Sequence, residues 1–600
     1  MECDTGDRRY LVMMYLHLDN PIRDRYNKNK HPSKPEDYSY FTMGSHPPPS
    51  PVRLFPSQNR TARKRSVPLS IFDATCARFT DTGAVWLFDA PSVATEDLGD
   101  NIAHRLRSSF IDTLNDFPQW AGQLHWAPFR PGTGDHTQRF QRCMLTFGGG
   151  SDPGVEWSVV QRDYTLDSIT PPSRSGAAAW WWDNNAFPQK DLVSPSKLAL
   201  AGLRDEEGLP CMVVQITLFA CGGYGVGVRL AHPVADAQSM MVFMHKWAAN
   251  SRNSESSSCE SVTQSTSLFG EPVFDPPQLD ARAAGDIDSA DGPDPELCAR
   301  ARALPMHRFS WWDTEAPGYS PHLVETTKNN MPPAEVLEKT TPSPSTTAPW
   351  HTWDLDRPAA SAVLHFTGDE LARLRERARA EASADGGGGD KEKNMNISRS
   401  DALLAHLFRL VTQARCAVKS SSSSSSYAPA PDDEVFLNYT LEARRRVEPP
   451  SSGDVSRSPS QNRGRGQAVS KEETTTTGAL ARQLRETLQQ FTPDAVAALL
   501  HESAFEVAPQ RLWRGFLGPR HLIVTSWLRT RLYDVDFGIS GSETGGSRTR
   551  PRYVHALMGK TDGILVLLGP AVEDGGVDVG VYLDGEAMGE FRGLVEGMVI

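Results

Sequence analysis

The 600-residue sequence has few cysteines and no spacing that would use them together. The eight cysteines are spread from Cys3 to Cys416, and none forms a Cys-x-x-Cys or Cys-x-Cys pair. This spacing excludes a disulfide framework and a zinc ribbon, and it fits a reducing compartment. The histidines show no His-Glu-x-x-His or other metal-ligand spacing. We therefore expect no bound metal.

Long apolar runs and an excess of positive charge are also missing. No stretch reaches the ~18 apolar residues that a membrane-spanning helix needs. The first residues are charged and do not resemble a signal peptide. The net charge of -12 and the pI of about 5.8 argue against a general nucleic-acid binder. The sequence predicts a cytoplasmic monomer that binds neither nucleic acid nor membrane.

Polar, low-complexity stretches divide the chain into two ordered regions. Residues 1–66 are rich in proline, tyrosine and charge, and we expect an extended or disordered N-terminal segment. Residues 67–250 form the first ordered region, and 251–349 read as a crossover linker that is partly disordered. The second ordered region spans 350–600. Disordered insertions are expected within it near 384–396, 418–434 and 450–477.

Strands and helices mix in both regions, which predicts an α/β fold. Residues 211–220 and 224–230 alternate in polarity around Gly222-Gly223, which predicts a β-hairpin. Residues 237–250 then carry apolar side chains at helical spacing. The second region repeats the theme with a strand at 362–366, a helix that Thr367 or Asp369 can cap, and a strand pair at 563–569 and 576–584.

His232 and Asp236 form a His-x-x-x-Asp sequence between the predicted hairpin and the apolar helix. This spacing is weak evidence alone, because His365 and Asp369 form a second copy. Helix capping explains Asp369, whereas the junction at His232 can face a cleft. An imidazole titrates near neutral pH and can remove the proton from a hydroxyl or amine that attacks a thioester. On the spacing alone, a structural loop histidine remains the alternative.

A covalent nucleophile is not required for this chemistry, because a thioester is already activated. The chain has no Gly-x-Ser-x-Gly sequence and no cysteine in a recognisable catalytic setting. The glycines at 223–227 lack the context of a dinucleotide loop and fit the hairpin. Residues 180–182, three consecutive tryptophans, fit either an acceptor pocket or a buried cluster. His245 in the following helix is expected to be structural.

The stretch from Gln215 to Trp247 resembles the HxxxD region of the BAHD acyltransferase family, in particular its fungal branch of trichothecene 3-O-acetyltransferase-like enzymes. Other segments resemble further family landmarks in the family's order, so the resemblance covers residues 67–595 without the insertions. These segments are Val67–Asp73, Leu106–Leu124, Ser400–Leu403, Leu441–Pro450, Thr525–Trp527 and Asp536–Gly538.

The resemblance implies an α/β fold of two similarly sized chloramphenicol-acetyltransferase-like domains, with the active-site channel at their interface. It implies an enzyme that transfers an acyl group, often acetyl, from acyl-CoA to a hydroxyl or amine of a small acceptor of secondary metabolism. Acyl-CoA would be a co-substrate, and no cofactor would be bound permanently.

The resemblance also assigns roles to individual residues. His232 matches the family's general base. Asp236 matches an aspartate that pairs with an arginine, here Arg444, and holds the motif in shape. Thr525 and Trp527 match positions for oxyanion stabilisation or substrate contact, although a core role for Trp527 is equally open.

The Asp536-Phe537-Gly538 segment is expected to be a structural turn that supports the motif, with Asp536 and Gly538 shaping it. The sequence departs from the family where Ile539-Ser540 replaces the usual Trp-Gly. Ala237 also stands where a glycine is expected.

Two alternatives to a CoA-dependent enzyme remain at this point. One is a condensation-type enzyme that takes its thioester from a carrier protein, although Ala231 and Ala237 stand where such enzymes have histidine and glycine. The other is a non-catalytic binding protein on a decayed acyltransferase scaffold, which the altered segment at 539–540 and the insertions motivate.

Overall fold

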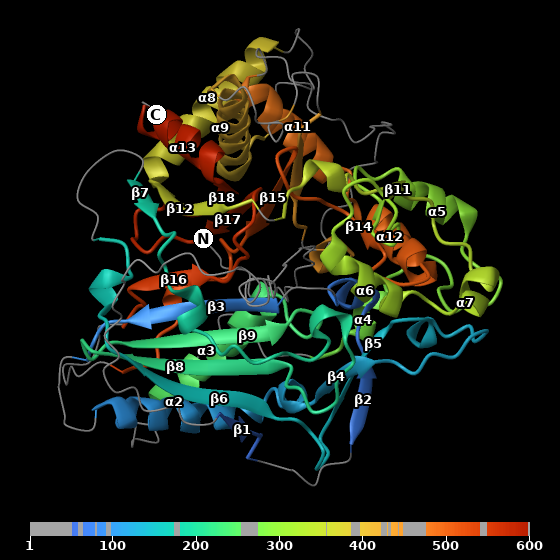
Figure 1. The fold of residues 1–600 in the computed structure, drawn as a ribbon, viewed down its shortest axis with the longest axis horizontal. Helices are drawn as coiled ribbons and strands as arrows, with labels where there is room; N and C mark the ends of the chain where they lie inside the picture. The colour runs from blue at the N-terminus through green and yellow to red at the C-terminus, as the bar shows by residue number, and fades with distance from the viewer. Residues whose placement is uncertain are drawn as a thin grey trace, which may run out of the picture.

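Two α/β halves, joined by a helical crossover segment, make up the computed structural model of the chain (Figure 1). The first half is blue to green and lies below the second, which is yellow to red. The structure describes residues 51–57, 64–77, 81–91, 98–172, 180–253, 274–355, 357–385, 396–421, 429, 434–441, 443–447, 476–539 and 549–597.

A six-stranded sheet, in the order β1-β6-β8-β9-β3-β16, forms the first half. Its strands are β1 (Val52–Leu54), β3 (Asp81–Phe88), β6 (Val155–Arg162), β8 (Met212–Phe219), β9 (Tyr224–Ala231) and β16 (Tyr553–Ala556). The helices α2 (Leu98–Leu114) and α3 (Ala237–Asn253) pack together and cover one face (Figure 1). A small side sheet contains β2 (Arg65–Pro68), β5 (Cys143–Phe147) and β4 (Gln123–Trp126).

The predicted hairpin in the first half is confirmed, because residues 212–218 of β8 pair antiparallel with residues 224–230 of β9. β9 also pairs with β3, so it lies inside the sheet and is covered on both edges. A glycine is required at 227, since a Cβ there would collide with the carbonyl oxygen of Leu192. The glycines of this segment therefore serve strand packing, as the sequence indicated.

A second six-stranded sheet, in the order β13-β15-β17-β18-β12-β7, forms the other half. Its strands are β13 (Phe436–Tyr439), β15 (His521–Ser526), β17 (Ile564–Leu568), β18 (Val577–Asp584), β12 (Ala359–Phe366) and β7 (Trp180–Asp183). The helices α8 (Gly368–Asp385), α9 (Arg399–Ser421), α11 (Thr477–Gln489) and α13 (Gly585–Glu596) pack on it (Figure 1). The predicted strand pair at the C-terminal end is confirmed, because β17 and β18 are antiparallel neighbours.

The two sheets exchange edge strands. β16 comes from the C-terminal part of the chain but pairs with β3 of the first sheet. β7 comes from the first half but pairs with β12 of the second sheet. The three tryptophans at 180–182 lie on β7 and are half-buried, so they belong to a sheet edge. This exchange ties the two halves together through backbone hydrogen bonds.

The crossover contains more structure than the sequence indicated. Residues 254–273 lie outside the described part, but residues 274–347 hold four helices and two short strands. These are α4 (Pro277–Asp280), α5 (Pro295–Arg302), α6 (Pro321–Asn330), α7 (Ala334–Lys339), β10 (Phe309–Ser310) and β11 (Thr346–Thr347). α5 packs on α12 (Pro493–Phe505), and β10 pairs with β14 (Leu512–Trp513). Burial of Ile287, Leu304 and Leu323 explains this order, because few aliphatics suffice when a neighbouring element covers them.

The N-terminal segment contains strand structure where it is described. β1 and β2 lie within the segment 1–66 or cross its end, and Leu54 is buried at the sheet edge. Residues 1–50 lie outside the described residues, as do most of the three expected insertions. In the described part of the chain, no helix combines the length and the apolar character that crossing a membrane requires.

Candidate active site

His232 lies in a tight turn between β9 and α3. β9 ends at Ala231, whose N–H donates to the carbonyl of Cys211 at 2.8 Å. The N–H of Val234 then donates back to the carbonyl of Ala231 at 2.9 Å, which reverses the chain. Within this turn His232 is only 5% exposed. The His-x-x-x-Asp residues at 232–236 therefore form a buried, ordered loop.

Asp236 caps the helix that follows the turn. Its Oδ1 accepts the N–H of Ser239 at 2.8 Å, and its carbonyl accepts the N–H of Met240 at 2.9 Å. These bonds satisfy N–H groups that the first turn of α3 leaves unpaired. Arg444, its expected partner, begins α10 (Arg444–Val447), but the Arg444 side chain lies outside the described part. The Asp236–Arg444 pair therefore stays a prediction.

Cys76 is a neighbour of His232 that sequence reasoning missed. Cys76 and Asp236 both act on the pKa of the His232 ring. Burial lowers the pKa of His232, but the charge and hydrogen bond of Cys76 and the charge of Asp236 raise it to about 9. The expectation that no cysteine has a catalytic setting stays a prediction. The signal for Cys76 in the sequence was its place just after the segment 67–73.

Short helix α1 (Ile71–Thr75) positions Cys76 and is held at both ends. Ser70 and Asp73 form a reciprocal capping box at its start. The buried carboxylate of Asp280, from α4, accepts the N–H of Ile71 at 3.0 and 3.1 Å. At the other end, the side-chain amide of Gln510 donates to the carbonyl of Ala74 at 2.7 Å. Cys76 thus directly follows an element that is held at both ends.

Thr525 and Trp527 lie in the second half, at the end of β15. Both side chains are buried, at 0% and 1% exposure. Trp527 belongs to the large apolar cluster that also contains Ala231 and Ala235 and that draws residues from both halves. The Trp527 indole N–H is buried and has no hydrogen-bond partner among the described residues. Such a donor is costly unless a ligand accepts from it.

His245 connects the helix after the motif to the segment that follows Trp527. His245 on α3 contacts the carbonyl of Thr530 through Nε2 at 3.4 Å. Burial lowers the pKa of His245 to about 4, so the ring is neutral at physiological pH. The side chain therefore serves packing between α3 and the second half.

Asp536, Phe537 and Gly538 form a turn that is anchored on the first half. The Asp536 Oδ1 accepts the N–H of Gly538 at 2.8 Å, and Gly538 has a φ of 69°. The Phe537 carbonyl accepts from Arg105 of α2 at 3.1 Å and from Ser251 of α3 at 2.8 Å. Of the divergent pair that follows, Ile539 is buried and Ser540 lies outside the described residues. The turn fastens the second half to the two helices beneath the motif.

His365, the histidine of the second His-x-x-x-Asp sequence, has a structural role. Nδ1 of His365 is 2.8 Å from Asp578, and Nε2 is 2.6 Å from Asp574. Thr367 caps α8 together with Glu370, whose N–H donates to the Thr367 hydroxyl at 3.2 Å. Both ring nitrogens of His365 are therefore engaged by carboxylates at the edge of the second sheet.

A histidine and carboxylate cluster also lies beside α4. Ligand atoms of Asp135, His136 and Asp288 lie within 4.8 Å of one another. Nδ1 of His136 is 2.8 Å from Asp288, and its Nε2 is 3.3 Å from Asp280. Because both ring nitrogens already contact carboxylates, the cluster is accounted for by ion pairing, and the absence of a metal stays a prediction.

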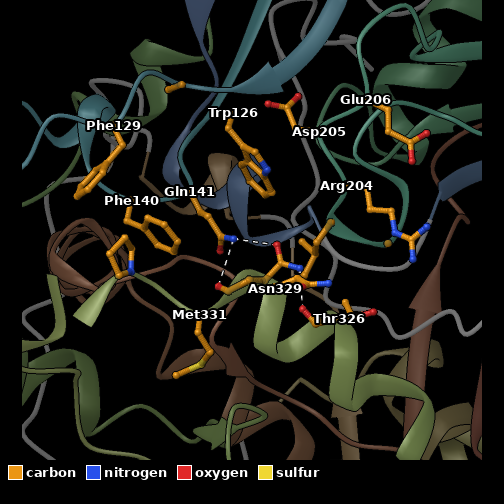
Figure 2. Close-up of a pocket in the computed structure, with 15 residues that line it drawn as sticks. Trp126, Phe129, Phe140, Gln141, Arg204, Asp205, Glu206, Thr326, Asn329 and Met331 are labelled. Atoms are coloured by element: carbon orange, nitrogen blue, oxygen red, sulfur yellow. Dashed lines mark hydrogen bonds between the residues drawn. The ribbon is translucent and has the colours of Figure 1, made fainter. Parts of the chain in front are cut away.

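A cavity of about 680 Å³ opens between β4 and the crossover (Figure 2). The rings of Phe129 and Phe140 lie on one side of it, and Arg204 and Glu206 lie on the other (Figure 2). Gln141 on its wall donates to Asn330 at 3.0 Å. The Gln141 carbonyl also accepts from Gln510, which holds the end of α1. The cavity wall is therefore joined to the helix that carries Cys76.

Comparison with known proteins identifies the family of this chain. The family model described as Transferase family matches residues 190–294 and 333–598, more than half of the chain. The chain belongs to this family, the BAHD-type acyltransferases. Acyltransferase AFT15-1 of Alternaria alternata is similar to it, with 26% identity over 89% of this chain and 94% of the relative. The expectation of an acyltransferase enzyme is confirmed.

Solved structures confirm the two-domain acyltransferase fold. TRI101 of F. sporotrichioides, solved with coenzyme A and T-2, superposes with a TM-score of 0.53 at 14% identity, over 88% of this chain and 97% of that protein. Vinorine synthase superposes with a TM-score of 0.51 at 16% identity, over 92% and 98%. At these identities the likeness concerns the fold of the BAHD-type acyltransferase.

Proposed function

We propose that this BAHD-type acyltransferase transfers an acyl group from acyl-CoA to a hydroxyl or amine of a small acceptor, with His232 as the general base. The observation that carries the proposal is the burial of the His232 loop in an apolar cluster shared by both halves. A neutral imidazole there can take a proton in a site from which water is excluded. The CoA and T-2 bound to the TRI101 structure support this substrate class.

Two further residues support the transition state in this proposal. The buried Trp527 indole N–H can donate to the oxyanion that forms on the thioester carbonyl, and Thr525 lies two residues before it on β15. Asp236 has a structural role, because its side chain caps the start of α3 and thereby fixes the end of the His232 loop. His232 takes the acceptor's proton and finally returns it to the departing CoA sulfur.

The cavity beside β4 and α6 is the entrance that we propose for the acceptor. Phe129 and Phe140 offer rings to an apolar body, and Arg204 and Glu206 offer charged groups at the opposite side. This lining fits a small metabolite with both apolar and polar faces, as expected of secondary metabolism. We also propose a cytoplasmic location, since the six described cysteines are unpaired and fit a reducing compartment. A monomer is the oligomeric state that we propose.

A panel assay tests this function. The purified chain is incubated with acyl-CoAs of increasing length and with alcohol and amine acceptors, and free thiol is measured. We expect thiol release that depends on both substrates. If no acyl-CoA binds or turns over, the proposal fails and a non-catalytic scaffold is favoured. Turnover with a carrier-bound thioester alone would instead favour the condensation-type alternative.

A further inference from the structure

His136 lies between two carboxylates that come from the crossover. Its Nδ1 is 2.8 Å from Oδ1 of Asp288, and its Nε2 is 3.3 Å from Oδ2 of Asp280. The Asp280 side chain is buried, whereas that of Asp288 is exposed. An ionised carboxylate only accepts hydrogen bonds, so each ring nitrogen must donate. Both nitrogens donate only in the imidazolium, and this geometry therefore calls for a protonated, positively charged His136.

The surroundings of the ring favour the same charge. Burial lowers the pKa of His136, but the hydrogen bonds and charges of Asp280 and Asp288 outweigh it and raise the pKa above 6.5. The carboxylates whose charges act within this group are Asp73, Asp135, Asp280, Asp286 and Asp288. The guanidiniums of Arg139 and Arg142 face the group too, and both donate to one backbone carbonyl of α12, at 2.7 and 2.6 Å. Negative charge therefore exceeds positive charge around the ring.

The segment that begins at His136 leads into the wall of the cavity. His136 opens a short 3-10 turn, His136–Gln138, and Phe140 and Gln141 follow it on the cavity wall (Figure 2). Arg139 fastens the same segment to the crossover, because its guanidinium donates to the carbonyl of Ile287 at 2.8 Å. The contacts of His136 and Arg139 therefore set where this wall lies against the crossover.

Asp280 carries the link from His136 to α1. Its two carboxylate oxygens accept the N–H of Ile71 at 3.0 and 3.1 Å. Burial raises the pKa of Asp280, and the hydrogen bond from His136 opposes that shift, so the imidazolium helps to keep this carboxylate ionised. Gln510 holds the other end of α1 and also donates to the carbonyl of Gln141. The contacts thus close a ring, from His136 through Asp280, α1 and Gln510 back to the wall that His136 begins.

We propose that protonated His136 is a positioning residue for the acceptor, which holds the cavity wall formed by Phe140 and Gln141 against the crossover and α1. This inference rests on the proposed function and deepens it, because acceptor binding then depends on a proton that takes no part in the reaction. Once the ring loses this proton, one of its nitrogens faces a carboxylate without a hydrogen atom between them. The link opens at that contact, and the acceptor binds to a looser wall.

The effect on acceptor binding has one direction with pH. The pKa of folded His136 is raised above 6.5, so the link is complete below that pH and is lost as the pH rises through the folded value. The KM for the acceptor should therefore rise toward alkaline pH by ~2–10-fold, the size of one net hydrogen bond. The KM for acyl-CoA should stay constant. Over the same range kcat should rise as His232 loses its proton, so the two histidines separate into a KM effect and a kcat effect.

Steady-state kinetics of three variants test the proposal, with the donor and acceptor that the panel assay identifies. His136→Gln carries no charge, so its acceptor KM should equal the alkaline wild-type value at every pH. Asp288→Asn, at an exposed carboxylate, removes one charge that raises the His136 pKa and should move the rise in KM to lower pH. His365→Gln is the matched control, because His365 also lies between two carboxylates but at the edge of the second sheet. Its acceptor KM should follow the wild type.

Hydrogen exchange read by mass spectrometry measures the link without substrates. Peptides that contain Ile71 or Asp280 should exchange faster in His136→Gln than in the wild type at pH 6, and His365→Gln should not change them. An acceptor KM that does not vary with pH in the wild type, or that varies equally in His136→Gln, would overturn the positioning role and leave acyl transfer standing. Absence of turnover with every acyl-CoA would overturn the proposed function, and the role in acceptor binding with it.

Discussion

The side-chain amide of Gln510 donates to the backbone carbonyl of Ala74 at 2.7 Å, although the two residues lie 436 positions apart. The same amide donates to the carbonyl of Gln141 at 3.1 Å. Gln510 itself is 1% exposed. One buried side chain from the second half therefore fixes both the helix before Cys76 and the wall of the cavity.

Replacing Gln510 by methionine should disturb both places at once. The change keeps the volume but leaves two buried carbonyls without this donor, at a cost of about 1–3 kcal/mol each. We expect a lower melting temperature and a lower kcat/KM, measured by thermal unfolding and by thiol release. Gln490→Met, at a half-buried position after α11, is the control. Equal melting temperatures and equal kcat/KM values for the two variants would show that the hydrogen bonds from Gln510 do not contribute.

The two His-x-x-x-Asp sequences should respond differently to mutation. His232→Ala removes the base, so kcat/KM should fall by ~10²–10⁴-fold while circular dichroism shows a folded protein. His365→Gln removes the contacts to Asp574 and Asp578, so it should lower the melting temperature and spare kcat of the folded enzyme. Near-normal turnover by His232→Ala would reject the mechanism.

Activity should rise toward alkaline pH. Only neutral His232 can accept a proton, and its pKa is about 9, so kcat/KM should increase until the pH passes that value. Cys76→Ala removes contributions that raise this pKa and leaves the effect of burial, so any residual activity should rise at lower pH. A profile centred at the same pH in wild type and variant would show that Cys76 does not interact with His232.

Asp236 should act mainly through the cap of α3. Asp236→Ala loses the acceptor for the Ser239 N–H, which costs about 0.5–2 kcal/mol, so soluble yield and melting temperature should fall. Asp236→Asn keeps an oxygen at this place and should retain more stability. Both variants lose the charge that raises the His232 pKa, so both pH profiles should shift downward. Equal stability of the two variants would contradict the capping role.

Gly538→Ala should loosen the turn that fastens the two halves. The φ of Gly538 is 69°, and an added Cβ would lie 2.8 Å from the Arg252 side chain. Strain of ~1 kcal/mol or more is expected at a positive φ, so the melting temperature should fall. Gly569→Ala is a matched control, because its Cβ would meet nothing within 4 Å. A larger loss in the control would reject this account of the turn.

Sequence reasoning succeeded where neighbours along the chain decide the structure. The β8–β9 hairpin follows from alternating side chains around two glycines. The cap of α8 at Thr367 is likewise local. The His232 turn was found because strand, turn and helix are consecutive, and the family resemblance then supplied its role.

Contacts between distant segments could not be predicted in this way. The short helix α1, which precedes Cys76, is held by Asp280 and Gln510, and both come from other parts of the chain. The exchange of β7 and β16 also depends on which sheet edges remain open after folding. The crossover looked like a linker because it has few aliphatic side chains, and α4 and α5 bury theirs in a cluster with α12. Amino-acid composition alone does not show which distant segments of the chain pack together.

The place of β16 has a consequence for synthesis on the ribosome. β3 has one edge paired with β9, and its other edge is completed only by Tyr553–Ala556. Most of the polypeptide must therefore emerge before the first sheet is closed. Until then β3 offers an open edge with apolar neighbours, which invites pairing with other nascent chains. Truncated or stalled products of this gene should consequently aggregate, and chaperone binding during translation should matter more to yield than the stability of the finished enzyme.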